Sequence, residues 1–341
     1  MTSRFNRRFV LAAGIAAAAV SLAGCASRAP APVATAPAAP AALAIYGNKQ
    51  TFEIAPVLLA ASHYYPGQAS VNMGSIANLV GAPSVPGFGT DGAADLATNA
   101  ETQLLRYSVE NPNLRVVMTV TEGLYRIVAR RSAGIATVAD LRGKRVATIP
   151  QTSSGYFLKL MLERAGLQFE DIVAVPITPL AGMTQALARG EVDAVVIWEP
   201  ESENAAQVLG DDRVEFSGHG VYRELFNLNT TAEKLADPVT RRAIVRFVRA
   251  IIDASSEVRR DPARAQELVR VAGTFDATDV VESWEHHTWL AGIAPDLLDV
   301  MEVQERWLAQ QANRPARDRA QLATLIDTSV YAEALALAPG E

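Results

Sequence analysis

A run of hydroxyl side chains directly follows an apolar, β-branched stretch and could bind a small ligand. The stretch is residues 146–149, and Thr152, Ser153 and Ser154 stand in the polar turn behind it. A helix beginning at this turn would add N–H groups without partners in the helix, so the site would suit an anion or a carbonyl oxygen. The alternative role for Thr152 and Ser153 is helix capping alone.

A second polar segment, beginning at Trp198, also follows an apolar run. Trp198 and Glu199 place an aromatic face beside a carboxylate, which could contact a ligand ring or an N–H group. The alternatives are structural: Trp198 could pack at the end of a sheet, and Glu199, Glu201 and Glu203 could only favour the positive end of a helix.

The sequence does not indicate an enzyme. It lacks HExxH, GxSxG, P-loop and GxGxxG motifs, and no base is suggested for a nucleophilic Ser153 or Ser154. Adjacent histidines on a helix point about 100° apart and cannot chelate together as an i, i+4 pair would. We therefore expect surface or capping histidines, no metal and no cofactor. The histidines are His63, His219, His286 and His287.

Residues 138–199 predict a β-α-β-α-β unit that would position both polar segments. Helical spacing of apolar residues predicts a helix ending at Gly166, and a second helix ends at Gly190. Such a unit has parallel strands and right-handed crossovers, and ligands bind beyond the carboxyl ends of the strands. The predicted strands are 146–149, 173–175 and 194–198, and the second helix is 180–188.

An earlier α/β series repeats this arrangement and ends its strands in polar loops. The predicted strands are 42–46, 69–73, 93–97 and 114–120, with helices at 54–61 and 101–109. For any one loop residue a solvated or capping role remains an alternative to ligand contact. Two such units suggest two lobes facing across a cleft. The polar residues are Asn48, Lys49, Gln50, Thr51, Thr98, Asn99 and Glu101.

The chain after residue 230 is predicted to be helical and to support the fold. Asp237 and Pro238 form a helix start, and Asp261 with Pro262 repeats the signal. Trp284, Trp289 and Trp307 are expected in the core. Further helices are predicted at 279–290, 295–310 and 317–337.

Residues 1–25 predict an export signal, with a basic start, an apolar core and the ending Leu-Ala-Gly-Cys. This ending resembles a bacterial lipoprotein box, which would make Cys25 the lipid-carrying residue. Cys25 is the one cysteine of the chain, so an internal disulfide is excluded. Residues 26–41 are almost entirely Ala and Pro and predict an extended tether. The net charge of −6 offers no basic field for nucleic acid.

Several motifs together resemble solute-binding proteins of ABC importers, in the group that handles nitrate, sulfonates, taurine and thiamine pyrimidine precursors. They are DLRGKRVAT, PQTSSGY, ALARGEVDAVVIWEP and GAADLATNAE, with Glu53, Pro56 and Val57. The resemblance implies a two-lobed periplasmic-binding-protein fold, each lobe a mostly parallel sheet flanked by helices. Chain crossings are expected near 121–125 and 222–227, giving lobe 1 as 42–124 plus 225–341 and lobe 2 as 125–224.

The resemblance implies a lipid-anchored, monomeric periplasmic protein that closes on a small solute and delivers it to an ABC permease and its ATPase. A sensor or scaffold lipoprotein with the same fold is the alternative. Hydroxyls beside carboxylates suggest a small zwitterion or an amino-heterocycle such as a pyrimidine, and disfavour nitrate. The expected ligand-binding residues are Asn48, Gln50, Thr51, Thr98, Asn99, Glu101, Thr152, Ser153, Ser154, Trp198, Glu199 and Asn227.

Overall fold

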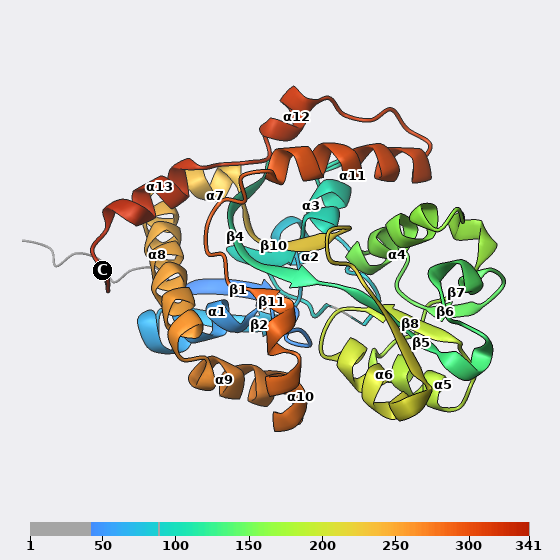
Figure 1. Cartoon of the computed structure of the whole chain (residues 1–341). Helices are drawn as coiled ribbons and strands as arrows, with labels where there is room; N and C mark the ends of the chain where they lie inside the picture. The colour runs from blue at the N-terminus through green and yellow to red at the C-terminus, as the bar shows by residue number, and fades with distance from the viewer. Residues whose placement is uncertain (1–41, 88, 341) are drawn as a thin grey trace, which may run out of the picture. The chain divides into compact units, whose positions relative to one another are not determined.

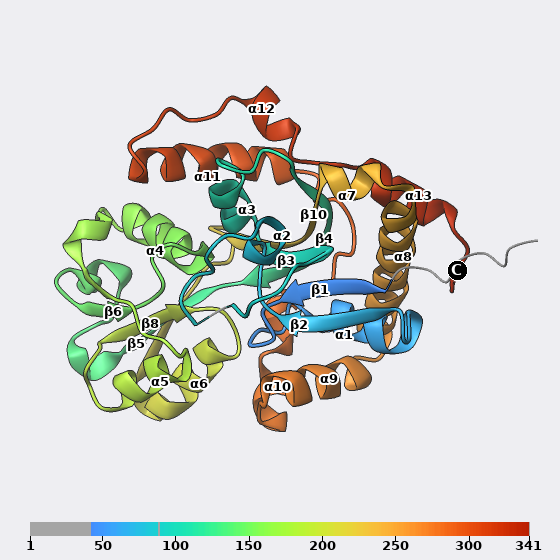
Figure 2. The same cartoon turned by 180° about the vertical axis from the view of Figure 1, so that it is seen from behind.

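The computed structural model describes residues 42–87 and 89–340, so the predicted export signal, Cys25 and the tether lie outside the described residues. The first of two sheets has six strands in the order β11-β4-β10-β3-β1-β2 (Figures 1 and 2). Its strands are β1 (Leu43–Gly47), β2 (Ala69–Met73), β3 (Leu96–Ala100), β4 (Leu114–Leu124), β10 (Arg223–Thr231) and β11 (His287–Thr288).

The second sheet has five strands in the order β7-β6-β8-β5-β9. β6 pairs in parallel with β7 and β8, as the β-α-β-α-β pattern predicts. Its strands are β5 (Arg126–Arg130), β6 (Arg145–Ala147), β7 (Val173–Val175), β8 (Ala194–Ile197) and β9 (Arg213–Ser217). α4 (Ser153–Arg164), α5 (Ala181–Ala188) and α6 (Glu201–Leu209) accompany this sheet (Figure 1).

Both sheets are mixed, so the expectation of mostly parallel sheets is wrong in this detail. β10 pairs antiparallel with β3 and β4, and β5 pairs antiparallel with β8 and β9. The physical reason is the connectivity. The chain leaves the first sheet from β4 into β5 and returns from β9 into β10, so the returning strands run opposite to the outgoing ones, and β10 pairs antiparallel with β4 and β9 with β5.

Helices from the end of the chain pack beside the first sheet. Figure 1 shows α8 (Pro238–Arg260) next to α1 (Ala55–Leu59) and α13 (Ser329–Ala336), and these contacts enclose an apolar core. The predicted start of α8 is confirmed, because the Asp237 carboxylate accepts a hydrogen bond from the N–H of Thr240 at 2.8 Å. The remaining helices are α2 (Ala77–Val80), α3 (Glu101–Tyr107), α7 (Ala232–Ala236), α9 (Ala263–Gly273), α10 (Ala277–Glu282), α11 (Leu297–Gln311) and α12 (Arg319–Ala323).

Three predicted elements are corrected. The strand predicted at 93–97 lies at 96–100, so Thr98 and Asn99 are strand residues rather than loop residues. The helix predicted at 279–290 ends at Glu282, because residues 287–288 instead pair with β4. The helix predicted at 317–337 is interrupted, because Ile326 forms a bridge with Val116 on the same strand. In the last two cases a tertiary β contact outweighs the local helical pattern.

The predicted core role of the tryptophans is confirmed for Trp289 and Trp307, which are buried. Trp284 is half-buried and packs on Trp289 with ring centroids 4.4 Å apart. Trp307 lies on α11, and its ring packs on the ring of Tyr156 of α4 with centroids 4.9 Å apart. α11 therefore reaches from the helices of the first sheet to those of the second.

Candidate functional site

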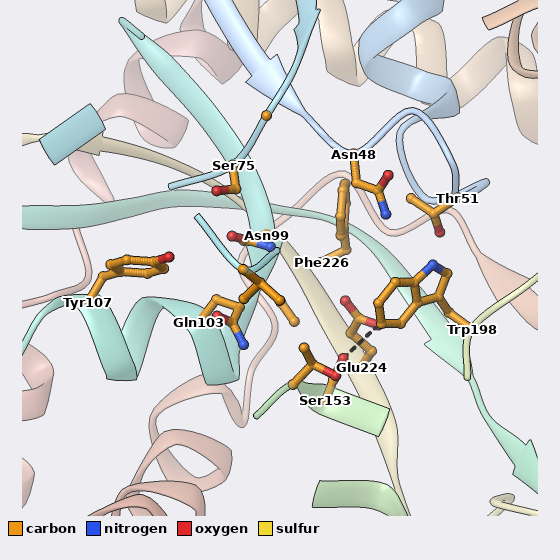
Figure 3. A pocket seen from close by; sticks show the side chains of 14 residues that line it. Asn48, Thr51, Ser75, Asn99, Gln103, Tyr107, Ser153, Trp198, Glu224 and Phe226 are labelled. Atoms are coloured by element: carbon orange, nitrogen blue, oxygen red, sulfur yellow. Dashed lines mark hydrogen bonds between the residues drawn. The ribbon is translucent and has the colours of Figure 1, made fainter. Parts of the chain in front are cut away.

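A pocket lies where connections from both sheets meet, with about 560 Å³ of empty space, part of it open to solvent. Figure 3 shows Asn48, Thr51 and Ser75 on one side of it and Gln103 and Ser153 on the other. The lining residues are Asn48, Thr51, Gly74, Ser75, Val85, Asn99, Ala100, Gln103, Tyr107, Thr152, Ser153, Trp198, Glu224 and Phe226.

The loop after β1 supplies Asn48 and Thr51. The strand can end here only with a glycine, because a Cβ on Gly47 would lie 2.3 Å from Oγ1 of Thr98. Thr51 is buried, and its hydroxyl has no hydrogen-bond partner among the described residues. Gln50 between them is exposed; its N–H donates to Oδ1 of Asn48 at 2.9 Å, and its carbonyl accepts from Nε1 of Trp198 at 3.3 Å.

Asn99 and Gln103 come from the end of β3 and the first turn of α3. Oδ1 of Asn99 accepts a hydrogen bond from the N–H of Ile76 at 3.3 Å, which holds its amide at the pocket wall. Nε2 of Gln103 donates to the carbonyl of Gln151 at 2.8 Å. Gln103 therefore connects the first sheet's side of the pocket to the loop before α4.

The start of α4 contributes Thr152 and Ser153 but not Ser154. Thr152 occupies the N-cap without a side-chain capping bond, and its hydroxyl donates instead to the carbonyl of Ile149 at 2.8 Å. Ser154 is buried and bonded to Thr152 through the hydroxyls, 2.9 Å apart. Ser153 is 2.9 Å from the hydroxyl of Tyr125 and 3.5 Å from the Glu224 carboxyl. Capping does not account for any of these hydroxyls.

Trp198 and Glu199 follow β8 and diverge. Trp198 lines the pocket, whereas Glu199 is outside the lining and pairs with Arg126 at 3.0 Å. Burial raises the pKa of Glu199 to about 7, although Arg126 acts in the opposite direction. Arg126 also pairs with Glu203 and Glu215, so this group of charges belongs to the second sheet and its helix.

β10 contributes Glu224 and Phe226, while the predicted Asn227 is buried beneath the strand. Oδ1 of Asn227 accepts from the Thr119 hydroxyl at 2.7 Å on β4. Because strand side chains alternate between faces, residues 224 and 226 share one face and 227 points to the other. The crossing segment was thus predicted, but the face of its strand was not.

Thr98 and Glu101 are fully buried outside the pocket lining. The carboxylate of Glu101 accepts from the Tyr222 hydroxyl at 2.7 Å and the N–H of Leu225 at 2.9 Å, and also from Gln304. Burial raises the pKa of Glu101.

The prediction that all histidines are surface or capping residues is wrong for His287. It is buried on β11, opposite Gly123, and its Nε2 is 3.8 Å from Glu53. Glycine at 123 leaves this space, since a Cβ there would lie 2.8 Å from the Glu53 carboxyl. His286 and His287 stand on a short 3-10 turn and a strand, so the helical geometry assumed for them does not apply.

The structure thus gathers six predicted residues in the pocket lining, namely Asn48, Thr51, Asn99, Thr152, Ser153 and Trp198. The other six lie outside it: Gln50, Thr98, Glu101, Ser154, Glu199 and Asn227. Sequence reasoning missed Ser75, Gln103 and Tyr107, because neither the pattern of α3 nor the position of Ser75 in its loop indicated that these side chains face a pocket. It also missed Glu224 and Phe226, although both lie in the predicted second crossing.

Two sheets joined by crossing strands, with a pocket where their loops meet, define the two-lobed fold of periplasmic binding proteins. The alkanesulfonate-binding protein SsuA from Xanthomonas axonopodis pv. citri, bound to MOPS, superposes with a TM-score of 0.64 at 19% identity. This match covers 85% of this chain and 99% of the other. The periplasmic aliphatic sulphonate binding protein SsuA from Escherichia coli gives 0.65 at 20%, covering 85% and 92%.

The chain belongs to the NMT1/THI5-like family, whose model matches residues 51–265. A candidate aliphatic sulfonates-binding protein of Escherichia coli (strain K12) is 31% identical over 185 residues, which cover 53% of this chain and 55% of the relative. The match thus spans about half the length of that relative. The desulfurization enzyme DszB, solved as a C27S mutant with biphenyl-2-sulfinic acid, shares the fold with a TM-score of 0.61 at 15% identity, covering 86% and 98%.

Among the described residues, no helix combines the length and the apolar character needed to cross a membrane. Within the same residues, no three His, Cys, Asp or Glu side chains are grouped so that they could hold a metal ion.

Proposed function

We propose that this protein is the solute-binding component of an ABC importer and captures a small organic solute in the pocket between its sheets. The observation that carries the proposal is the composition of the lining, to which the first sheet's side supplies Asn48, Asn99 and Gln103 and the second sheet's side supplies Ser153 and Trp198. A ligand in this pocket touches both sides at once. Membership of the NMT1/THI5-like family supports the same role.

Capture proceeds by closure of lobe 2, residues 125–224, onto lobe 1. The hinge is formed by the two connections between the sheets, β4 to β5 through Tyr125 and β9 to β10 through residues 218–222. The N–H of Gly218 donates to the Tyr125 carbonyl at 2.7 Å, so the two connections run side by side. A ligand that contacts both lobes stabilises the closed form relative to the open one.

The closed protein then docks on its permease, and the partner ATPase supplies the energy of transport. In this proposal the chain is periplasmic and monomeric, and lipid on Cys25 anchors it to a membrane through the tether of residues 26–41. Catalysis is not part of the proposal. Ser153 lies beside the Tyr125 hydroxyl and the Glu224 carboxyl rather than beside a histidine.

A thermal-shift panel on purified protein, unfolded and refolded to remove any carried ligand, tests the proposal. The panel holds sulfonates, taurine, nitrate, amines, pyrimidines, riboflavin and amino acids. A ligand at one hundred times its Kd adds about 2.7 kcal/mol and should raise Tm by several degrees. Calorimetry on each positive compound then measures Kd. A panel without any shift would contradict solute binding and favour the sensor or scaffold alternative.

A further inference from the structure

The described residues that line the pocket include a carboxyl group and no permanently charged basic side chain. Among the described lining residues there is no Lys or Arg, and Glu224 is the one carboxyl group. The nearest basic residues in sequence are already engaged. Arg106 donates to the Gln151 carbonyl at 2.9 Å, and Nζ of Lys49 donates to the Val71 carbonyl at 3.4 Å.

Glu224 belongs to a group of three buried carboxyls, with Glu53 and Glu101. Burial is the largest cause that raises the pKa of Glu224, and the charges of Glu53 and Glu101 raise this pKa further. Glu53 lies against Gly123, the residue that pairs with Glu224 across β4 and β10. The three carboxyls therefore meet where the second crossing passes the pocket.

The groups that face these carboxyls are mostly neutral. Glu224 contacts the hydroxyls of Tyr125 and Ser153, and Glu101 contacts Tyr222 together with a glutamine amide. The basic group within ion-pair distance, among the described residues, is His287, 3.8 Å from Glu53. Oε2 of Glu53 has no hydrogen-bond partner there.

This arrangement disfavours an anion in the pocket. A sulfonate would lose its hydration without meeting a cation, and it would be repelled by any ionised carboxyl of the group. A cation would be attracted by any ionised carboxyl of the group. It would also lie near the rings of Trp198 and Phe226, and aromatic faces attract organic cations.

We propose that the pocket selects a small organic cation, a protonated amine with a flat or apolar body, and rejects sulfonates. The ammonium group lies against the Glu224 carboxyl, and the body packs on Trp198 and Phe226. This inference rests on the proposed solute-binding function and specifies its ligand class. It separates the chain from relatives whose names refer to sulfonates.

A cationic ligand has a consequence for protons. Burial, followed by the neighbouring Glu53 and Glu101, raises the pKa of Glu224, so the empty pocket favours the protonated form of this carboxyl. An ammonium group beside it favours the ionised form, and the proton is released to solvent on binding. Affinity for the amine should therefore increase as pH rises.

Matched pairs of probes test the selection. 2-Phenylethylamine is compared with 2-phenylethanesulfonate and 2-phenylethanol, and pentylamine with pentanesulfonate, by calorimetry on the refolded wild-type protein. The expected result is binding of at least one amine at least tenfold more tightly than its sulfonate partner. Heats measured in two buffers of different ionisation enthalpy should show proton release on amine binding.

Glu224→Gln keeps the side-chain shape and removes the ionisable group. It should lower amine affinity at least tenfold and abolish proton release, while Glu170→Gln, an exposed residue of the second sheet's unit, should change neither. If Glu224→Gln fails to fold, proton release by the wild type decides the question. Sulfonate binding without amine binding overturns the inference and leaves solute binding intact. If none of the amines binds, the inference is overturned as well. If no compound of the wider panel binds, both the inference and the proposed solute-binding function are overturned.

Discussion

Glu199 and Glu224 are both buried carboxyl groups, but their neighbours give them different roles. Glu199 pairs with Arg126 of β5 and accepts the N–H of Glu203 of α6 at 3.0 Å, and Nε2 of His286 lies 3.9 Å from its carboxyl. Glu224 contacts hydroxyls at the pocket wall. The first organises structure, and the second is available to a ligand.

Glu199 should make the stability of the protein depend on pH. Its pKa is about 7 when folded and 4.5 in the reference state, so the folded form binds more protons between these values. Stability from this group is therefore present at low pH and is lost as pH rises through 7. Relative to the wild type, Glu199→Gln should gain up to about 3 kcal/mol between pH 4.5 and 7.5. Urea unfolding at both pH values measures this, and parallel curves for the two proteins would contradict it.

Trp198 should matter for ligand binding through its ring. Trp198→Ala removes the aromatic wall and should weaken binding by about tenfold or more, since 1.4 kcal/mol corresponds to tenfold in Kd. Trp198→Phe keeps an aromatic face and should retain most of the affinity. Calorimetry with the best ligand compares the two variants. Equal affinity of Trp198→Ala and the wild type would remove Trp198 from the site.

At the scale of elements, the start of α4 depends on a close approach between the helix and the preceding loop. A Cβ on Gly155 would lie 2.3 Å from the carbonyl oxygen of Pro150, so a side chain cannot be added without moving the backbone. The same turn holds Thr152 and Ser153 at the pocket. The close packing at Gly155 therefore also fixes the positions of the two pocket residues.

Gly155→Ala should destabilise the protein by about 2 kcal/mol, because overpacking of a tight contact displaces backbone. It should also weaken ligand binding by moving Ser153. Lys159→Ala, on a later turn of the same helix, is the matched control and should lie within about 0.5 kcal/mol of the wild type. Urea unfolding and calorimetry give both quantities. Wild-type stability in Gly155→Ala would show that the loop relaxes freely.

At the scale of the whole molecule, the proposed closure depends on contacts between the two sides of the pocket. Arg106 of α3 donates to the Gln151 carbonyl before α4 and stands outside the pocket lining. Gln207 of α6 donates to Glu282 of α10 at 2.9 Å. These bonds form only when the two sides are together, so they favour closure.

Arg106→Ala should weaken ligand binding about two- to twelvefold by disfavouring the closed form, since a hydrogen bond contributes about 0.5–1.5 kcal/mol. The loss should appear mainly as faster dissociation in stopped-flow measurements, with Tm of the empty protein nearly unchanged. Arg106→Lys preserves a donor and should lie between the two. An unchanged dissociation rate in Arg106→Ala would show that this contact does not stabilise the ligand-bound form.

Much of the fold was predictable because its signals are local. Apolar runs of strand length, glycine at helix ends and the Asp237-Pro238 start all act within a few residues, and the structure confirms them. Positive φ at Gly166 and Gly190 is the reason glycine ends these helices. The same local patterns, with the family resemblance, led to the two-lobed fold.

Tertiary structure decided which side chains reach the pocket. Strand alternation placed Glu224 and Phe226 in the lining and turned Asn227 toward Thr119, and a shift of one residue reverses that choice. Pairing with β4 converted a predicted helix into β11 and buried His287. The sequence by itself determined the elements and the loops that meet. The charge of the pocket emerged only from long-range contacts, because side-chain direction depends on strand partners that the local pattern does not specify.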